Sequence, residues 1–175
     1  MNSKIKKIIK KKNKSKIVSL TAYSKNISKI LDKYCDIILV GDSMANVLYD
    51  QKNTHKISLD DLIKHTLSVQ KGIKKSLLVV DMPKGSYSNT FTALKNARII
   101  MKKTNCHAVK LENFKNNYKI INLLVKKKIP VMGHIGFTPQ FKRSFRIEGQ
   151  SKKEIEKLLK EAKSIERAGA FSIVL

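Results

Sequence analysis

Ala108-Val109-Lys110-Leu111-Glu112 is a short apolar run that closes on a carboxylate, and two earlier stretches of the chain have the same form. They are Ile37-Ile38-Leu39-Val40-Gly41-Asp42 and Leu77-Leu78-Val79-Val80-Asp81. Such runs are typical of buried strands in a parallel sheet. A carboxylate is costly to bury alone, so three of them on consecutive strands indicate one rim where a divalent cation offsets their charge. The sequence therefore predicts an α/β enzyme with a metal site at Asp42, Asp81 and Glu112.

The rest of the chain repeats the same unit. Six predicted strands alternate with about five predicted helices, which favours a parallel sheet, either doubly wound or closed as a (β/α)8 barrel. One predicted helix opens with a capping box of Ser58 and Asp61, and the helix expected at residues 90–103 has Thr90 as its possible cap and Phe91 on its apolar face. No GxGxxG motif follows the first strand, which argues against dinucleotide binding. The run at residues 170–175 is the sixth predicted strand, so a barrel would need two more. We expect a basic N-terminal segment with a short helix at residues 1–15, and an incomplete TIM barrel of about six βα units at residues 16–175.

Composition limits the classes of protein that fit. The chain has 175 residues, 42% of them hydrophobic, which is enough for one domain with a real core. It contains no apolar run of the roughly 18 residues that a membrane span requires, so we expect no membrane partner. The two cysteines, Cys35 and Cys106, lack CxxC spacing and predict free thiols in a cytoplasmic protein.

The formal charge of +24 raises an alternative, a basic protein that binds nucleic acid. Only four of the 37 basic residues are arginine, the residue that suits bidentate recognition of phosphates and bases. The lysines are also spread along the whole chain. We therefore expect no specific nucleic-acid partner.

Several motifs occur together in the order and spacing of a known family. They are Lys16-Ile17-Val18-Ser19-Leu20-Thr21-Ala22-Tyr23, Val40-Gly41-Asp42-Ser43, His65-Thr66, Val80-Asp81-Met82-Pro83, Val109-Lys110-Leu111-Glu112 and Gly133-His134-Ile135-Gly136-Phe137-Thr138-Pro139-Gln140. Any one short piece is weak evidence, but the set is specific. With it, the chain resembles the ketopantoate hydroxymethyltransferase family over nearly all of its length beyond the basic N-terminus.

The resemblance implies a cytoplasmic (β/α)8 barrel that forms a homo-oligomer, typically a decamer. It implies Mg2+ as cofactor and transfer of a hydroxymethyl group from 5,10-methylenetetrahydrofolate to 3-methyl-2-oxobutanoate, giving 2-dehydropantoate in pantothenate biosynthesis. Another Mg2+-dependent barrel that acts on 2-oxo acids, such as the phosphoenolpyruvate mutase and isocitrate lyase group, is the alternative enzyme class. That group would require its own catalytic loop after the fourth or fifth strand, and none is visible.

The family's residues map onto this sequence by position. Asp42, Asp81 and Glu112 match the metal-associated carboxylates, and Asp42, Ser43, Asp81 and Lys110 match positions that contact the oxo acid. Lys110 would place positive charge where negative charge develops on the substrate, and Ser43 would hydrogen-bond the substrate carboxylate. Some of the three acids are expected to act through water, because Mg2+ retains several waters.

The family's general base directly follows the sixth strand, beyond Leu175. We therefore expect no catalytic base among the residues present, with His134 as the possible exception, and no useful turnover by this chain alone.

Structural alternatives remain for each site residue. Asp42 could cap a helix, Asp81 could be a turn residue, Glu112 and Lys110 could be solvated, and His134 could be a hydrogen-bonded structural histidine.

Overall fold

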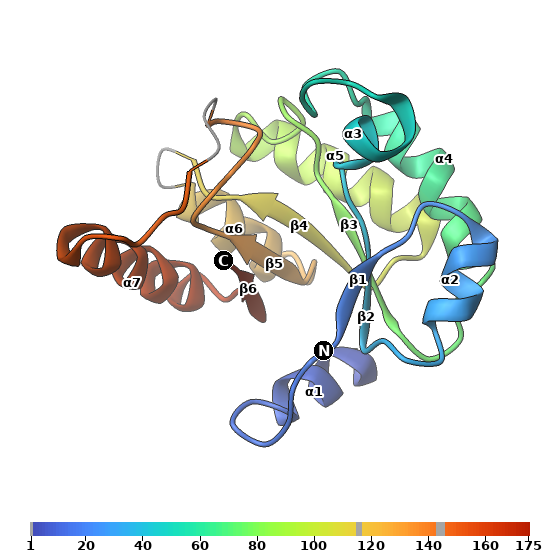
Figure 1. The fold of residues 1–175 in the computed structure, drawn as a ribbon, viewed down its shortest axis with the longest axis horizontal. Helices are drawn as coiled ribbons and strands as arrows, with labels where there is room; N and C mark the ends of the chain where they lie inside the picture. The colour runs from blue at the N-terminus through green and yellow to red at the C-terminus, as the bar shows by residue number, and fades with distance from the viewer. Residues whose placement is uncertain (1, 115–116, 143–145) are drawn as a thin grey trace.

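Six parallel strands form a single sheet in the computed structural model, which describes residues 2–114, 117–142 and 146–175. The strands follow one another across the sheet in chain order, each hydrogen-bonded to the next (Figure 1). They are β1 (Ser19–Thr21), β2 (Ile37–Val40), β3 (Leu77–Asp81), β4 (Ala108–Glu112), β5 (Val131–His134) and β6 (Ser172–Val174).

This sequential order distinguishes between the two architectures that the sequence left open. A doubly wound sheet reverses its strand order at a switch point, whereas a (β/α)8 barrel adds each strand on the same side of the last. The observed order is that of a barrel, and six strands make an incomplete wall. The predicted fold class is confirmed.

Seven helices occur among the described residues. They are α1 (Ser3–Lys10), α2 (Lys25–Leu31), α3 (Met44–Tyr49), α4 (Leu59–Gln70), α5 (Thr90–Thr104), α6 (Tyr118–Lys126) and α7 (Lys152–Arg167). The main core lies between the outer face of the sheet and helices other than α1, and it includes Val80 and Val109 from the strands and Leu62, Ala97 and Ile121 from the helices. Figure 1 shows α4, α5 and α6 arranged in succession along that outer face.

Most of the helices agree with the pattern of the sequence. The cap of α5, the exposure of Phe91 and the presence of α3 differ from it. The predicted capping box at the start of α4 is present, because Ser58 and Asp61 exchange side-chain and backbone hydrogen bonds. The predicted cap of α5 at Thr90 is wrong, because the Asn89 side chain accepts from the Thr92 amide instead. Phe91, predicted to face the core, is 78% exposed. The short helix α3 was not predicted.

The inner face of the curved sheet has a smaller core of its own, closed by α1. Ile5 and Ile8 of this helix are buried against Ile37, Leu77 and Val79. Their spacing of three residues places both on one face of the helix. The N-terminal helix predicted from the sequence is thus present, and it lies at the opposite end of the strands from α3 (Figure 1). The boundary at residue 15 stays a prediction.

Candidate functional site

The inner face of the sheet changes from apolar to charged along its strands. Successive side chains of a strand point to opposite faces, so alternate residues share one face. On β3, Leu77 and Val79 belong to the inner core and Asp81 is the next residue on that face. On β4, Ala108 belongs to it, and Lys110 and Glu112 follow. The β5 residues Met132 and His134 repeat the pattern. Strand periodicity therefore delivers these ionisable groups to one rim.

Lys110 and Asp81 form a buried ion pair at this rim. The two residues are register partners on β4 and β3, and Lys110 Nζ lies 2.8 Å and 2.9 Å from the two carboxylate oxygens of Asp81. Burial raises the pKa of Asp81 to about 6 against the opposing effect of Lys110, and the charges of Asp42 and Glu112 raise it further. Asp81 is therefore still ionised at neutral pH, where it faces a charged lysine. Neither residue is a solvated side chain or a turn residue.

Glu112 is fully buried, and its two oxygens differ in environment. Oε2 accepts from the Gln140 backbone amide at 3.0 Å, whereas Oε1 is buried without a hydrogen-bond partner. His134 Nδ1 lies 3.4 Å from Oε1, across the β4–β5 register. Burial is the largest cause that raises the pKa of Glu112 to about 7; the charge of Lys110 opposes it and the like charge of Asp42 adds to it. The solvated-acid alternative for Glu112 is excluded.

His134 is held neutral by its surroundings. Burial and the nearby charge of Lys110 lower its pKa to about 4, against the opposing charges of Asp81 and Asp42. A neutral imidazole can donate through one ring nitrogen and accept through the other. At neutral pH the ring beside Glu112 is therefore a hydrogen-bonding group without charge.

Asp42 follows β2 after a single glycine and is buried. Its Oδ2 accepts from the side-chain amide of Gln140 at 2.9 Å. The alternative that Asp42 caps a helix is wrong, because the N-cap of α3 is Ser43. A Cβ atom on Gly41 would lie 2.9 Å from Ser43 Oγ and 3.5 Å from Asp81 Oδ2, so a side chain at this position would displace the Ser43 hydroxyl.

Ser43 does not cap α3 with its side chain and instead contacts Tyr23. Ser43 Oγ and the Tyr23 hydroxyl lie 2.8 Å apart. The Tyr23 backbone carbonyl is 2.8 Å from His65 Nδ1, and His65 Nε2 is 2.8 Å from the Tyr49 hydroxyl. A chain of hydrogen-bonding groups thus connects Ser43 to α3 and α4. Tyr23 and His65 lie in motifs that the sequence singles out, but their contact with each other could not be read from it.

Gln140 connects the carboxylates and has no role assigned from the sequence. Its backbone and side chain reach Glu112 and Asp42 respectively, and its side-chain oxygen accepts from the Tyr87 hydroxyl. Its place in the motif at residues 133–140 was visible in the sequence. The contact with a residue 98 positions earlier was not.

We call Asp42, Asp81, Lys110 and Glu112 the rim cluster. With all four groups ionised, three negative charges face one positive charge, which leaves two negative charges in excess. A divalent cation would offset this excess, and the unpartnered Glu112 Oε1 is a buried oxygen able to face one. Within the described ranges, no three His, Cys, Asp or Glu side chains are grouped so that they hold a metal ion by themselves. The donor set therefore fits a hard cation that takes part of its coordination from water or substrate oxygens.

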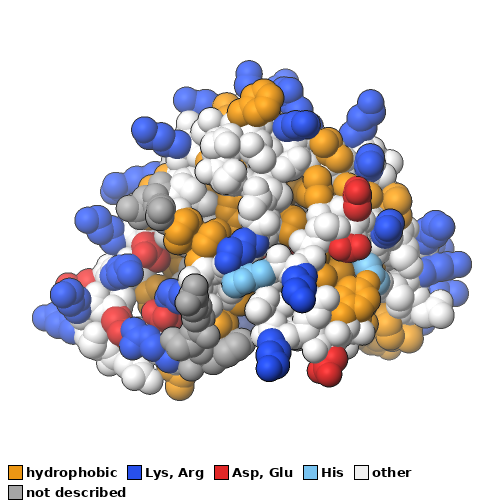
Figure 2. Space-filling view, turned by 90° about the horizontal axis from the view of Figure 1, so that it is seen from above, with side chains coloured by type: hydrophobic (Ala, Val, Ile, Leu, Met, Phe, Trp, Pro, Cys, Tyr) orange, Lys and Arg blue, Asp and Glu red, His pale blue; other side chains and the backbone are white. Residues whose placement is uncertain are grey.

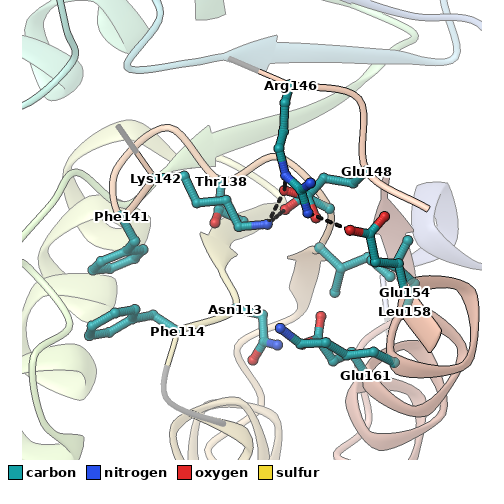
Figure 3. Close-up of a pocket in the computed structure, with 13 residues that line it drawn as sticks. Asn113, Phe114, Thr138, Phe141, Lys142, Arg146, Glu148, Glu154, Leu158 and Glu161 are labelled. Atoms are coloured by element: carbon teal, nitrogen blue, oxygen red, sulfur yellow. Dashed lines mark hydrogen bonds and ion pairs between the residues drawn. The ribbon is translucent and has the colours of Figure 1, made fainter. Parts of the chain in front are cut away.

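Two cavities are lined in part by residues that follow β4 and β5, and no residue of the rim cluster lines either one. One of about 440 Å³ lies between the loop after β5 and α7, and it contains the ion pairs of Lys142 with Glu148 and of Arg146 with Glu154 (Figure 3). Phe114 and Phe141 stack at its edge with ring centroids 3.9 Å apart. The other, of about 660 Å³, has basic and aromatic lining residues, namely Lys52, His55, Lys84, Phe114, Phe137, Phe141 and Lys142.

The positive charge is not concentrated in one place on the face of the molecule shown in Figure 2. Lys and Arg side chains are spread around the face seen from above rather than gathered in one stripe (Figure 2).

Among the described residues, no helix has the length and apolar composition of a membrane span.

Comparison with protein families gives a match over almost the whole chain. A family model described as ketopantoate hydroxymethyltransferase matches residues 2–175. The 3-methyl-2-oxobutanoate hydroxymethyltransferase of Pelagibacter ubique (strain HTCC1062) is 53% identical over 175 residues, which is 100% of this chain and 68% of that protein. The protein of the same name from Clostridioides difficile (strain 630) is 45% identical over 166 residues, which is 91% of this chain and 60% of that protein. The chain thus spans 60% to 68% of the length of these relatives.

Two solved structures with a similar fold have the names of other enzymes. A 2,3-dimethylmalate lyase of the PEP mutase/isocitrate lyase superfamily matches with a TM-score of 0.69 and 12% identity, over 100% of this chain and 62% of that one. A phosphonopyruvate hydrolase in complex with oxalate and Mg++ matches with a TM-score of 0.71 and 10% identity, over 98% and 62%. At this level of identity the likeness concerns the fold alone.

Proposed function

The chain belongs to the ketopantoate hydroxymethyltransferase family, and from this premise we propose that it carries the metal- and oxo-acid-binding part of such an enzyme. The reaction is transfer of a hydroxymethyl group from 5,10-methylenetetrahydrofolate to 3-methyl-2-oxobutanoate, giving 2-dehydropantoate. The observation that supports this most directly is the rim cluster. In this cluster the pKa values of Asp81 and Glu112 are raised, and three buried carboxylates share one lysine at the carboxyl ends of adjacent strands.

Asp42, Asp81 and Glu112 would hold Mg2+, directly or through water. Bound there, Mg2+ would polarise the substrate's keto group and balance the negative charge that develops when the C3 proton leaves. Asp81 is already paired with Lys110, so the unpartnered Oε1 of Glu112 is the oxygen best placed to turn toward a cation.

Lys110 and Ser43 would act on the oxo acid itself. Lys110 is held by Asp81, so its positive charge is fixed in a low-dielectric setting, where it stabilises developing negative charge without reorganisation. The Ser43 hydroxyl would donate to the substrate carboxylate. Its contact with Tyr23 at 2.8 Å restricts the rotation of that hydroxyl before substrate arrives.

His134 is the residue of this chain to test first as the base that removes the C3 proton. A base is most effective when its pKa lies near the working pH, and the pKa of His134 is lowered to about 4. We therefore expect slow exchange of the C3 proton in D2O, compared with a full-length relative. His134→Gln would be compared with His107→Gln, because the His107 ring accepts a structural bond from the Leu78 amide outside the site. Exchange as fast as in the relative, abolished only by His134→Gln, would identify His134 as the base.

Calorimetric titration tests the proposed site directly. We expect 3-methyl-2-oxobutanoate to bind only with Mg2+ present, and Asp42→Asn to weaken both ligands at least about 10-fold. Asp60→Asn, at an aspartate in the first turn of α4, is the matched control. Oxo-acid binding that is indifferent to Mg2+ and to Asp42→Asn would contradict the proposal.

The larger basic and aromatic cavity is the proposed place for the folate. Its phenylalanine rings suit an aromatic ligand, and Lys52 and Lys84 suit the carboxylates that such a ligand carries. We expect Lys84→Gln to weaken folate binding while leaving the oxo acid unaffected. Equal loss of both ligands would argue against this placement.

We also propose that the protein is cytoplasmic and homo-oligomeric and has no specific nucleic-acid partner. Scattered lysines give weak, salt-sensitive attraction to polyanions rather than sequence readout. Titration with duplex DNA at about 150 mM salt should give no sequence-selective complex. A nanomolar complex that depends on sequence would overturn this expectation.

A further inference from the structure

Gln140 is fully buried and uses its hydrogen-bonding groups on several elements at once. Its backbone amide donates to Glu112 Oε2 at 3.0 Å. Its side-chain nitrogen donates to Asp42 Oδ2 at 2.9 Å and to the Met82 carbonyl at 3.0 Å. Its side-chain oxygen lies 2.5 Å from the Tyr87 hydroxyl. The side chain thereby joins residues that follow β2 and β3, and the backbone amide of the same residue reaches the last residue of β4.

The orientation of the Gln140 amide follows from its neighbours. The carboxylate of Asp42 and the carbonyl of Met82 are both acceptors, so the amide nitrogen must face them. The amide oxygen must then face Tyr87, whose hydroxyl is the donor of that bond. Burial, and the nearby charges of Glu112 and Asp81, raise the pKa of Tyr87, so its hydroxyl keeps the proton that this bond requires. The Tyr87 contact thus prevents the amide from flipping.

We infer that Gln140 is a positioning residue, which occupies one oxygen of Asp42 and one of Glu112 and so fixes the oxygens left to face a cation. The inference rests on the proposed function, because it concerns the same metal. For Glu112 the division is visible, since Oε2 is occupied and Oε1 has no partner. For Asp42 the occupied oxygen is Oδ2. Carboxylates held by such hydrogen bonds lose little freedom when a metal binds, and removing their partners typically costs about 10–100-fold in affinity.

Gln140→Met tests the contact with Asp42 separately from the contact with Glu112. Methionine has a similar volume, retains the backbone amide that binds Glu112, and removes the donor to Asp42. With Mn2+ alone as the probe, we expect binding measured by electron paramagnetic resonance to weaken at least about 10-fold. We also expect water-proton relaxation to report one more bound water, because a freed Asp42 carboxylate is replaced by solvent. Gln70→Met, at the end of α4, is the control and should change neither quantity.

A double-mutant cycle with Asp42→Asn distinguishes positioning from general damage. If Gln140 acts through Asp42, the double variant binds Mn2+ no more weakly than Asp42→Asn alone. Additive losses would overturn the inference, and so would a lowered melting temperature with unchanged Mn2+ affinity. If Gln140→Met does not fold, Tyr87→Phe replaces it with a loss of about 2–5-fold in the same direction, and no loss would overturn the inference. A wild-type chain that takes up no Mn2+ refutes the proposed metal site together with this inference, whereas uptake unaffected by Gln140→Met refutes the inference alone.

Discussion

The two ends of the inner sheet face are built from the same strands, yet they have opposite energetics. At the amino-terminal end, Leu77 and Val79 pack under Ile5 of α1, and the transfer of apolar surface from water stabilises the fold. Two residues further along β3, Asp81 occupies the same face and is also buried. Its charge must be offset by Lys110, and burial still raises its pKa. The amino-terminal end therefore stabilises the fold. The carboxyl-terminal end lowers its stability, because charged side chains are buried there.

The largest expected effect comes from breaking the charged end. Lys110→Met leaves Asp81 buried without its partner, which typically costs about 3–5 kcal/mol of unfolding free energy. Asp81 can relieve part of this cost by taking up a proton, so the loss should be larger at pH 8 than at pH 5. Urea unfolding of both chains at the two pH values measures it.

A second variant converts the charged end into a copy of the apolar end. Asp81→Leu combined with Lys110→Met removes both charges, and replacement of a buried ion pair by apolar residues is often neutral or stabilising. The double variant should thus recover most of the stability that Lys110→Met loses, while Mg2+ binding is weakened because Asp81, one of the proposed metal carboxylates, is gone. A double variant as unstable as the single one would show that the pair itself stabilises the fold.

The next effect is at the apolar end. Ile5→Ala removes a fully buried side chain under the sheet and should cost about 3 kcal/mol, because a cavity adds to the lost burial. Ile9→Ala, at a position 39% exposed on the same helix, should cost less than about 1 kcal/mol. Thermal or urea unfolding gives both values. Cation binding per folded molecule should be unchanged in each, and a change in Ile5→Ala would mean that the two ends are coupled.

Much of this comparison could be predicted from local sequence, because it depends on short-range periodicity. The apolar runs ending in Asp81 and Glu112 predict strands, and alternation then places these residues on the face of Leu77 and Ala108. The capping box at Ser58 and Asp61 is equally local. Phe91 was misplaced because the buried stripe of α5 consists of Ala93, Ala97, Ile100 and Thr104, so small residues rather than the aromatic one face the sheet.

The features that escaped prediction depend on distance in the chain or on weak local signals. No pattern shows that Gln140 reaches Asp42, because the contact depends on how the loop after β5 folds across the rim. Helix α3 has six residues and no side-chain cap, so it carries few of the marks by which helices are recognised. The closure of the inner face by α1 required knowing that the sheet curves around it.

The smallest effect concerns the pH dependence of the charged end and isolates Glu112. Its pKa is raised from 4.5 to about 7 in the fold, so the stability it contributes is complete below about pH 4.5 and is lost as pH rises through 7. Between pH 5 and pH 7 this loss is about 2 kcal/mol. His134, with its pKa lowered to about 4, changes in the opposite sense over the same range and masks the loss in the wild-type chain. Subtracting the unfolding free energy of the wild type from that of Glu112→Gln at each pH cancels the contribution of His134. From pH 5 to pH 7, the variant should become more stable relative to the wild type by about 2 kcal/mol, measured by urea unfolding with chelator present. Glu166→Gln, at an exposed glutamate, should show no such shift. A pH-independent difference for Glu112→Gln would mean that burial does not raise the pKa of Glu112, and a bound cation would then have no unfavourable burial of this carboxylate to relieve.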